Sequence, residues 1–198
     1  MSARKIFKYV ITTFFVTAAA NVSAHAVILS YGDIYNLPIP QESGGSKGWA
    51  EDAILNIADD YVIWDLDVEI NITHTNVFDL QVFLISPAGT NVCLSRFYLD
   101  EFFIGANYDH TIFDDEAPVP IELGLAPFTG RYRPRYGLDA FDGESILGAW
   151  RLRVYDGYEF DAGILESFEL QVTIPEPATL LLLTAGFIFV KRFRFSAG

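Results

Sequence analysis

The amino-acid sequence predicts an all-β domain, an antiparallel sandwich or barrel, between two terminal segments of a different kind. Two observations carry this prediction. Residues 64–73 alternate apolar and polar side chains without a break. Between the two terminal segments, Gly and Pro punctuate the chain often, and no long stretch shows the 3.6-residue period of a helix. Many short strands separated by turn residues are typical of sandwiches and barrels.

Residues 64–73 are the clearest predicted strand. Successive side chains of a strand face opposite sides of the sheet, so a period of two places one set in the core and the other in water. A helix would scatter the apolar set around its circumference. The apolar set is Trp64, Leu66, Val68, Ile70 and Ile72, and the polar set is Asp65, Asp67, Glu69, Asn71 and Thr73.

Four further segments predict strands. Residues 80–85 are apolar almost throughout, which fits a strand covered on both faces, and Pro87-Ala88-Gly89 predicts a turn after them. Residues 150–155 and 168–174 alternate in the same way as the first strand, whereas 53–57 is a weaker candidate. We expect residues 41–48 to form a flexible loop.

Length and charge limit the classes of function. The 198 residues allow one domain of ordinary size. Residues 27–174 hold 7 basic and 25 acidic residues, a net charge of −18. Such a surface repels phosphate backbones, which argues against nucleic-acid binding and favours cations or basic partners. Cys93 is the only cysteine, so the chain has no internal disulfide; we expect a buried, inert thiol.

The first 26 residues have the three parts of a secretory signal peptide. Arg4, Lys5 and Lys8 precede an apolar run, and small residues follow it. We expect a signal peptidase to cleave after Ala26, with cleavage after Ala24 as the alternative. The mature protein is therefore predicted to be exported.

The last 24 residues, 175–198, form a second predicted targeting signal. Pro175-Glu176-Pro177 leads into an apolar run at 178–190 and then a basic tail. Thirteen apolar residues are short for a stable membrane span, which takes about 20. The three parts in this order resemble the bacterial PEP-CTERM sorting signal, which implies a membrane-embedded exosortase that removes the tail. A plain C-terminal membrane anchor is the alternative. Both predict a domain held in the cell envelope or released outside the cell.

A series of short motifs runs along 37–174, nearly the whole predicted mature chain. The motifs are His74-Thr75, Asp79-Leu80, Ser86-Pro87-Ala88-Gly89-Thr90, Thr111 to Ala117, Pro127-Phe128-Thr129-Gly130 with Pro134, Gly148-Ala149-Trp150-Arg151-Leu152, Asp156, Gly163-Ile164-Leu165 and Phe168-Glu169-Leu170. In type and order they resemble the P domain, also called Homo B, of kexin- and furin-type proprotein convertases. One departure from that family is Phe168, where Trp is usual. The resemblance implies a jelly-roll-like β-sandwich at 27–174.

Catalysis by this chain is not expected. A Ser-His-Asp protease needs a histidine beside an activated serine, and the predicted mature chain offers only His74 and His110. No Gly-x-Ser-x-Gly motif occurs. The resemblance places no catalytic group at His74, for which we expect a structural role. We expect His110 to be an isolated histidine in a loop, because its spacing from the other histidine and from Cys93 is not that of metal ligands.

Two residue clusters are candidate binding sites. Asp114, Asp115 and Glu116 fall in a predicted loop and supply the oxygen ligands that Ca²⁺ prefers, although a solvated acidic surface is the alternative. The second cluster gathers much of the basic charge and is a candidate patch for acidic glycans or another acidic surface; an ordinary loop neutralised by carboxylates is its alternative. It consists of Arg131, Tyr132, Arg133, Arg135 and Tyr136.

Three functional hypotheses follow. The first is a non-catalytic, exported interaction module of the cell surface or matrix. The second is an accessory domain that acts in trans on a subtilisin-like serine peptidase, as the P-domain resemblance implies. The third is an exopolysaccharide-binding module, which the resemblance to a PEP-CTERM protein suggests.

Overall fold

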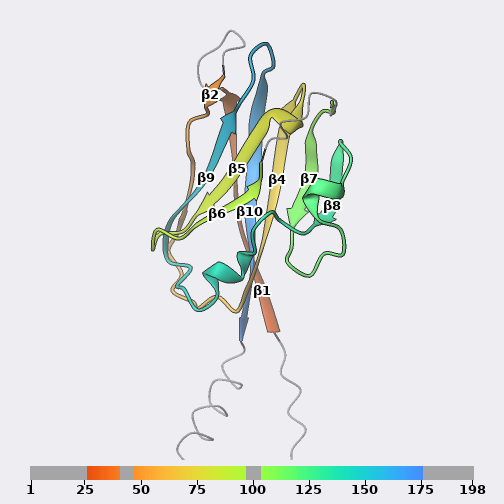
Figure 1. Ribbon diagram of the computed structural model, residues 1–198. Coiled ribbons are helices and arrows are strands. Elements are labelled where there is room, and N and C mark those ends of the chain that lie inside the picture. Colours follow the sequence, from red (N-terminus) through yellow and green to blue (C-terminus); the bar gives the residue numbers. More distant parts are fainter. Residues whose placement is uncertain (1–25, 41–46, 97–103, 176–198) are drawn as a thin grey trace, which may run out of the picture.

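A computed structural model describes residues 26–40, 47–96 and 104–175, which form a sandwich of two β-sheets (Figure 1). The first sheet has the order β1-β10-β4-β7-β8 and the second the order β2-β9-β5-β6, with β3 also paired to β9. The strands are β1 (Ala26–Ile39), β2 (Gly48–Trp49), β3 (Ala53–Ile57), β4 (Asp65–His74), β5 (Leu80–Ile85), β6 (Asn91–Ser95), β7 (Tyr108–Phe113), β8 (Phe128–Tyr132), β9 (Gly148–Asp156) and β10 (Gly163–Pro175).

Three short 3₁₀ helices, η1 (Val77–Asp79), η2 (Ile121–Leu123) and η3 (Leu138–Phe141), connect strands. Among the described residues, no helix is long and apolar enough to cross a bilayer. Ala24 and the predicted apolar run 178–190 lie outside the described residues. Ala26 and Pro175, which border the two predicted processing sites, pair with each other where β1 and β10 end side by side (Figure 1).

The predicted all-β sandwich is confirmed, with one departure from antiparallel pairing. Strands β7 and β8 run parallel, with Tyr108 opposite Phe128 and Phe113 opposite Tyr132. A parallel pair needs a crossover connection, here residues 114–127, which carry the predicted acidic cluster and η2. This connection places the acidic cluster and the basic residues after β8 at the same sheet edge.

Most of the apolar side chains of the alternating strands are buried in the core, as predicted. Leu66, Val68, Ile70 and Ile72 of β4 are buried, whereas Trp64 precedes the strand and is 54% exposed, so its assignment to the core was wrong. The side chains of β9 and β10 that we expected inside are also buried: Trp150, Leu152, Val154, Phe168, Leu170, Val172 and Ile174.

Strand β5 corrects a second prediction. Leu80, Val82 and Leu84 are buried, but the side chains between them are half-buried, so the strand is not fully covered on its outer face. The predicted turn follows it: Gly89 adopts a φ of 96°, and the Ser86 N–H donates to the Thr90 carbonyl oxygen across the turn. Glycine takes this left-handed conformation without the steric cost that a Cβ would impose.

Candidate functional site

His74 is the last residue of β4 and is completely buried. Its Nε2 lies 3.2 Å from Asp156 Oδ2, and its Nδ1 lies 2.9 Å from the Asn76 carbonyl oxygen. Both ring nitrogens are thus engaged by groups of the fold, and among the described residues no serine hydroxyl is a hydrogen-bond partner of the ring. His74 joins the end of β4 to the end of β9, which is the structural role that we expected.

Asp79 lies next to this pair and is also buried. Asn76 Nδ2 donates to Asp79 Oδ1, and the Gly157 N–H donates to the Asp79 carbonyl oxygen. Burial raises the pKa of Asp79 to about 7, and a hydrogen bond to Asp161 adds to the shift. Asp156, the partner of His74, is buried at the end of β9.

His110 lies in β7, so the prediction of a loop histidine was wrong. Its Nδ1 is 2.8 Å from Glu69 Oε1 on the neighbouring strand β4. This hydrogen bond raises the pKa of the exposed His110 ring. The pair joins two strands on the solvent face of the sheet.

The acidic cluster binds the protein's own groups. Asp114 Oδ2 accepts a hydrogen bond from Arg131, and Asp114 Oδ1 accepts one from the Glu116 N–H. Asp115 accepts from the backbone N–H groups of Leu138 and Asp139 at the start of η3. Among the residues that the structure describes, no group of three or more acidic, histidine or cysteine side chains is arranged to hold a metal ion. Calcium binding by this cluster stays a prediction.

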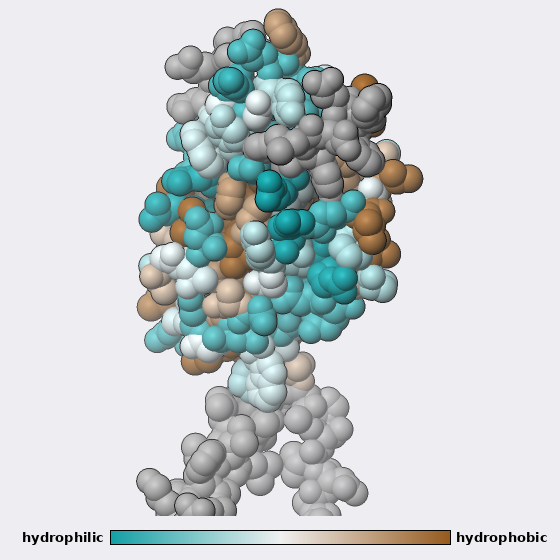
Figure 2. Space-filling view, viewed as in Figure 1, coloured by the Kyte–Doolittle hydropathy of each residue, from teal (hydrophilic) through white to brown (hydrophobic). Residues whose placement is uncertain are grey.

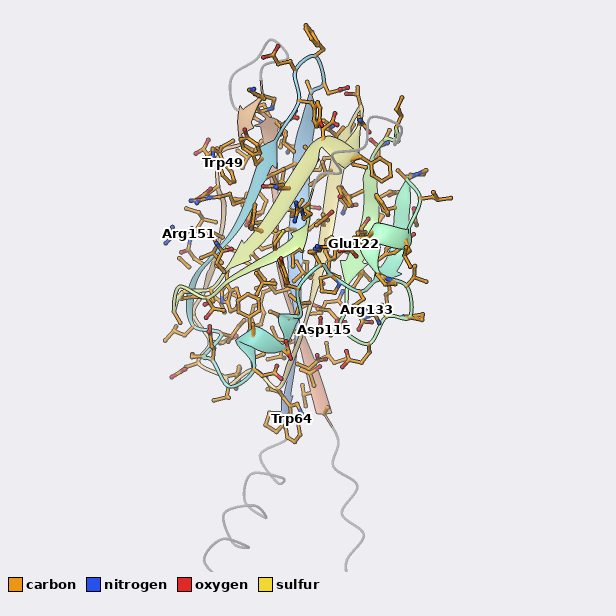
Figure 3. All side chains as sticks on the ribbon, viewed as in Figure 1. Trp49, Trp64, Asp115, Glu122, Arg133 and Arg151 are labelled. Atoms are coloured by element: carbon orange, nitrogen blue, oxygen red, sulfur yellow. The ribbon has the colours of Figure 1, made fainter. Side chains whose placement is uncertain are left out.

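The predicted basic patch divides into an inner and an outer half. Arg131 forms ion pairs with Asp67 and Asp114 at 2.6 and 2.7 Å, and the Tyr132 ring packs edge-on against Phe128. Arg135 pairs with Glu122 at 2.9 Å. The outer half consists of Arg133 (Figure 3) and Tyr136, whose side chains are exposed.

The crossover connection exposes three aliphatic side chains beside this outer half. Val119 is 40% exposed, Leu123 75% and Leu125 74%. We call these three residues the leucine rim. The Arg133 N–H donates to the Val119 carbonyl oxygen, and the Arg133 carbonyl accepts from the Ile121 N–H, so the rim is fixed beside the basic residues. Exposed apolar residues gather at this side of the molecule, over β7 and β8 (Figure 2).

The sequence analysis missed the rim because no periodic pattern distinguishes it. Its signal is the run of apolar residues and prolines at 117–127, which holds a single charge, Glu122. In an acidic domain, the apolar side chains of such a run are candidates for burial in the core or for a contact surface. The structure places Ala117 and Ile121 in the core and the leucine rim outside.

Cys93 of β6 is buried, as expected, and its Sγ donates to the Ser95 carbonyl oxygen. Burial raises the pKa of the Cys93 thiol to about 11. The thiolate is the reactive form of cysteine, so this thiol is chemically inert near neutral pH.

Comparison with known proteins confirms the predicted resemblance over part of the chain. Residues 63–117 match the family model of the proprotein convertase P-domain. This segment runs from the end of the β3–β4 connection to the start of the crossover and includes His74 and Asp79. P domains are non-catalytic accessory domains, in agreement with the structural role of His74. No curated protein matches the chain.

Solved structures with a similar fold include two of a serine protease from Aeromonas sobria. The protease in complex with its chaperone shares 20% identity at a TM-score of 0.43 and covers 77% of this chain. The protease alone shares 19% identity at a TM-score of 0.44 and covers 79% of this chain. The present chain spans only 27% and 28% of those chains.

Proposed function

We propose that this protein is an exported, non-catalytic interaction domain of the cell envelope whose partner is a subtilisin-like serine peptidase. In this proposal the domain acts on the peptidase in trans, as a P-domain-like accessory domain whose family model matches residues 63–117. In this proposal the leucine rim with Arg133 and Tyr136 is the docking surface. The observation that carries it is the exposure of Leu123 and Leu125, at 75% and 74%.

The physical reason is the cost of leaving these side chains in water. Burying apolar surface gains about 25 cal/mol per Å², so two almost fully exposed leucines beside a valine supply a strong apolar contact once a partner covers them. Tyr136 and Arg133 belong to residue types that are enriched at protein interfaces. They are also exposed, and they provide the polar border that such a contact needs.

Export and sorting complete the proposal. A signal peptidase removes residues 1–26, and an exosortase-type enzyme recognises Pro175-Glu176-Pro177 and removes the tail that follows. Before that step the apolar run at 178–190 holds the protein at the membrane. Mass spectrometry of the exported protein tests this part: we expect an N-terminus at Val27, or at His25, and a missing basic tail. A tail retained on the released protein would contradict the sorting step.

Docking is tested by the affinity of the full chain, kept in mild detergent, for subtilisin-like peptidases exported by the same organism. The double variant Leu123→Ser, Leu125→Ser removes the apolar contact, and we expect at least a roughly tenfold weaker complex. Ile34→Ser is the matched control, because Ile34 is 74% exposed on β1 at the opposite edge of the same sheet. Equal affinity of the double variant and the wild type would contradict docking through the rim.

A further inference from the structure

The outer face of the second sheet carries three aromatic side chains in contact across strands. Trp49 of β2 lies opposite Tyr155 of β9, with ring centroids 4.8 Å apart. Phe83 of β5 lies 6.1 Å from the same tryptophan ring. Trp49 is 48% exposed, so its indole remains open to a ligand while Tyr155 and Phe83 support it.

Two arginines extend this face along β9. Arg151 and Arg153 alternate with buried Leu152, so both side chains lie on the same outer face as Tyr155. Arg153 is held in place: its Nε and Nη2 donate to the two carboxylate oxygens of Asp52 at 2.8 and 2.7 Å, and its guanidinium lies 5.5 Å from the centre of the Trp49 ring. A fixed guanidinium loses little conformational entropy on binding.

Arg151 differs from Arg153 in having no counter-charge. It is exposed, and within the described part of the chain it forms no ion pair or side-chain hydrogen bond. Trp49 and Arg151 lie along the same side of the molecule, whereas Arg133 and Trp64 lie elsewhere (Figure 3). Arg153 is neutralised by Asp52, so Arg151 supplies the unpaired positive charge on this face of a domain whose residues 27–174 carry a net charge of −18.

The aromatic rings and arginines on this face suit a carbohydrate ligand better than a protein partner. The face of an aromatic ring is electron-rich and packs against the polarised C–H groups of a sugar ring. Gln81 lies opposite Tyr155, and Arg153 with its partner Asp52 lies beside Trp49. These groups can form hydrogen bonds with sugar hydroxyls. A protein interface would need a contiguous apolar centre, which this alternation of rings and charges does not provide.

We propose that this face binds an acidic polysaccharide, with sugar rings stacked on Trp49 and Tyr155 and a uronate carboxylate on Arg151. The row from residue 151 to residue 155 spans about 13 Å at the rise of a β-strand, which is enough for more than one sugar ring. The negative surface elsewhere on the domain repels the same polymer, which disfavours binding away from Arg151. This site is separate from the leucine rim and does not depend on the peptidase partner.

The test uses two probes, oligogalacturonate and its methyl ester, and the full chain in mild detergent. Trp fluorescence and calorimetry measure the binding of each probe. Trp49→Ala is expected to weaken binding of both probes roughly tenfold. Arg151→Gln is expected to weaken oligogalacturonate alone, because the ester has no charge to lose. Trp64→Ala is the matched control, an exposed tryptophan at another place on the molecule, and we expect no change from it.

Three results would overturn the proposal. The first is the absence of binding by either probe. The second is an equal loss in Trp49→Ala and Trp64→Ala, which would show non-specific stacking. The third is weaker peptidase binding in Trp49→Ala with no oligosaccharide binding, which would make this face a protein contact. The docking experiment and the oligosaccharide experiment can fail independently. The leucine rim variants change a different surface, so their effect on peptidase binding does not bear on oligosaccharide binding.

Discussion

Arg131 Nη1 lies 2.7 Å from Asp114 Oδ2, which joins the predicted basic patch to the predicted acidic cluster. The same nitrogen is 2.6 Å from Asp67 Oδ2 of β4. Charges that the sequence analysis assigned to two separate sites therefore neutralise each other at the edge of the first sheet. Within the described part of the chain, Arg133 of the outer half forms no ion pair, and it is exposed together with Tyr136.

Replacing Arg131 by Gln is expected to lower the free energy of unfolding by about 1 kcal/mol, because it leaves the carboxylates of Asp67 and Asp114 without their cation. The arginine side chain is 46% exposed, so solvent screening keeps the effect small. Chemical denaturation measures it. Arg133→Gln is the control, since Arg133 forms no ion pair in the described part of the chain. A larger loss in the control would contradict the account.

Calcium is expected to leave the melting temperature unchanged. The Asp115 oxygens already accept backbone N–H groups at η3, and Asp114 is paired with Arg131, so a metal ion would have to displace these contacts. Thermal unfolding with millimolar Ca²⁺ and with EDTA tests this. A calcium-dependent rise that disappears in Asp115→Asn would instead support the calcium site predicted from the sequence.

Replacing His74 by Ala is expected to lower the free energy of unfolding by about 3 kcal/mol. His74 and Asp156 are both fully buried, and removing the ring leaves the carboxylate without its partner. His110→Asn, at an exposed position, is expected to change stability little. If His74→Ala instead folded normally and abolished a peptidase activity of the pure protein, the non-catalytic account would be wrong.

The stability of the domain is expected to depend on pH through Asp79. Its pKa in the folded protein is about 7, above the ordinary value of 3.8, so the folded state holds a proton that the unfolded chain releases. The contribution to stability is therefore full below about pH 4 and is lost as the pH rises through 7, with a slope of up to about 1.4 kcal/mol per pH unit.

The variant Asp79→Asn, which resembles the protonated acid, should flatten the part of the stability profile between pH 5 and 7. Asp161→Asn removes the acid whose hydrogen bond adds to the shift and should flatten the profile partly. Urea unfolding at a series of pH values measures both. A slope that persists unchanged in Asp79→Asn would assign the pH dependence to another group.

The sequence predicted the strands that alternate apolar and polar side chains, and also β5, which is an almost continuous apolar run. It missed strands that show neither pattern. Residues 64–73, 150–155 and 168–174 alternate because one face of each strand is buried, and all three were found. Strand β1 was missed, because it lies at a sheet edge and most of its side chains are exposed or half-buried, which removes the alternating signal. The parallel pairing of β8 was not predictable from a local pattern, since it depends on the crossover.

The candidate sites show the same limit. The sequence shows that Asp114 and Arg131 are charged. It does not show that they neutralise each other across the β7–β8 crossover. Trp49 and Arg153 are more than a hundred positions apart in the chain and meet only through pairing of β2 with β9. Surfaces built by sheet register need the fold before they can be recognised.

The most direct test of the central claim is the lifetime of an exported subtilisin-like peptidase at elevated temperature, measured with and without the full chain. The account predicts that the chain slows the loss of peptidase activity, because a ligand that binds only the folded peptidase raises its stability with the logarithm of the ligand concentration. The Leu123→Ser, Leu125→Ser variant should lose this effect, and Ile34→Ser should keep it. An unchanged lifetime at saturating concentrations of the wild-type chain would contradict the claim.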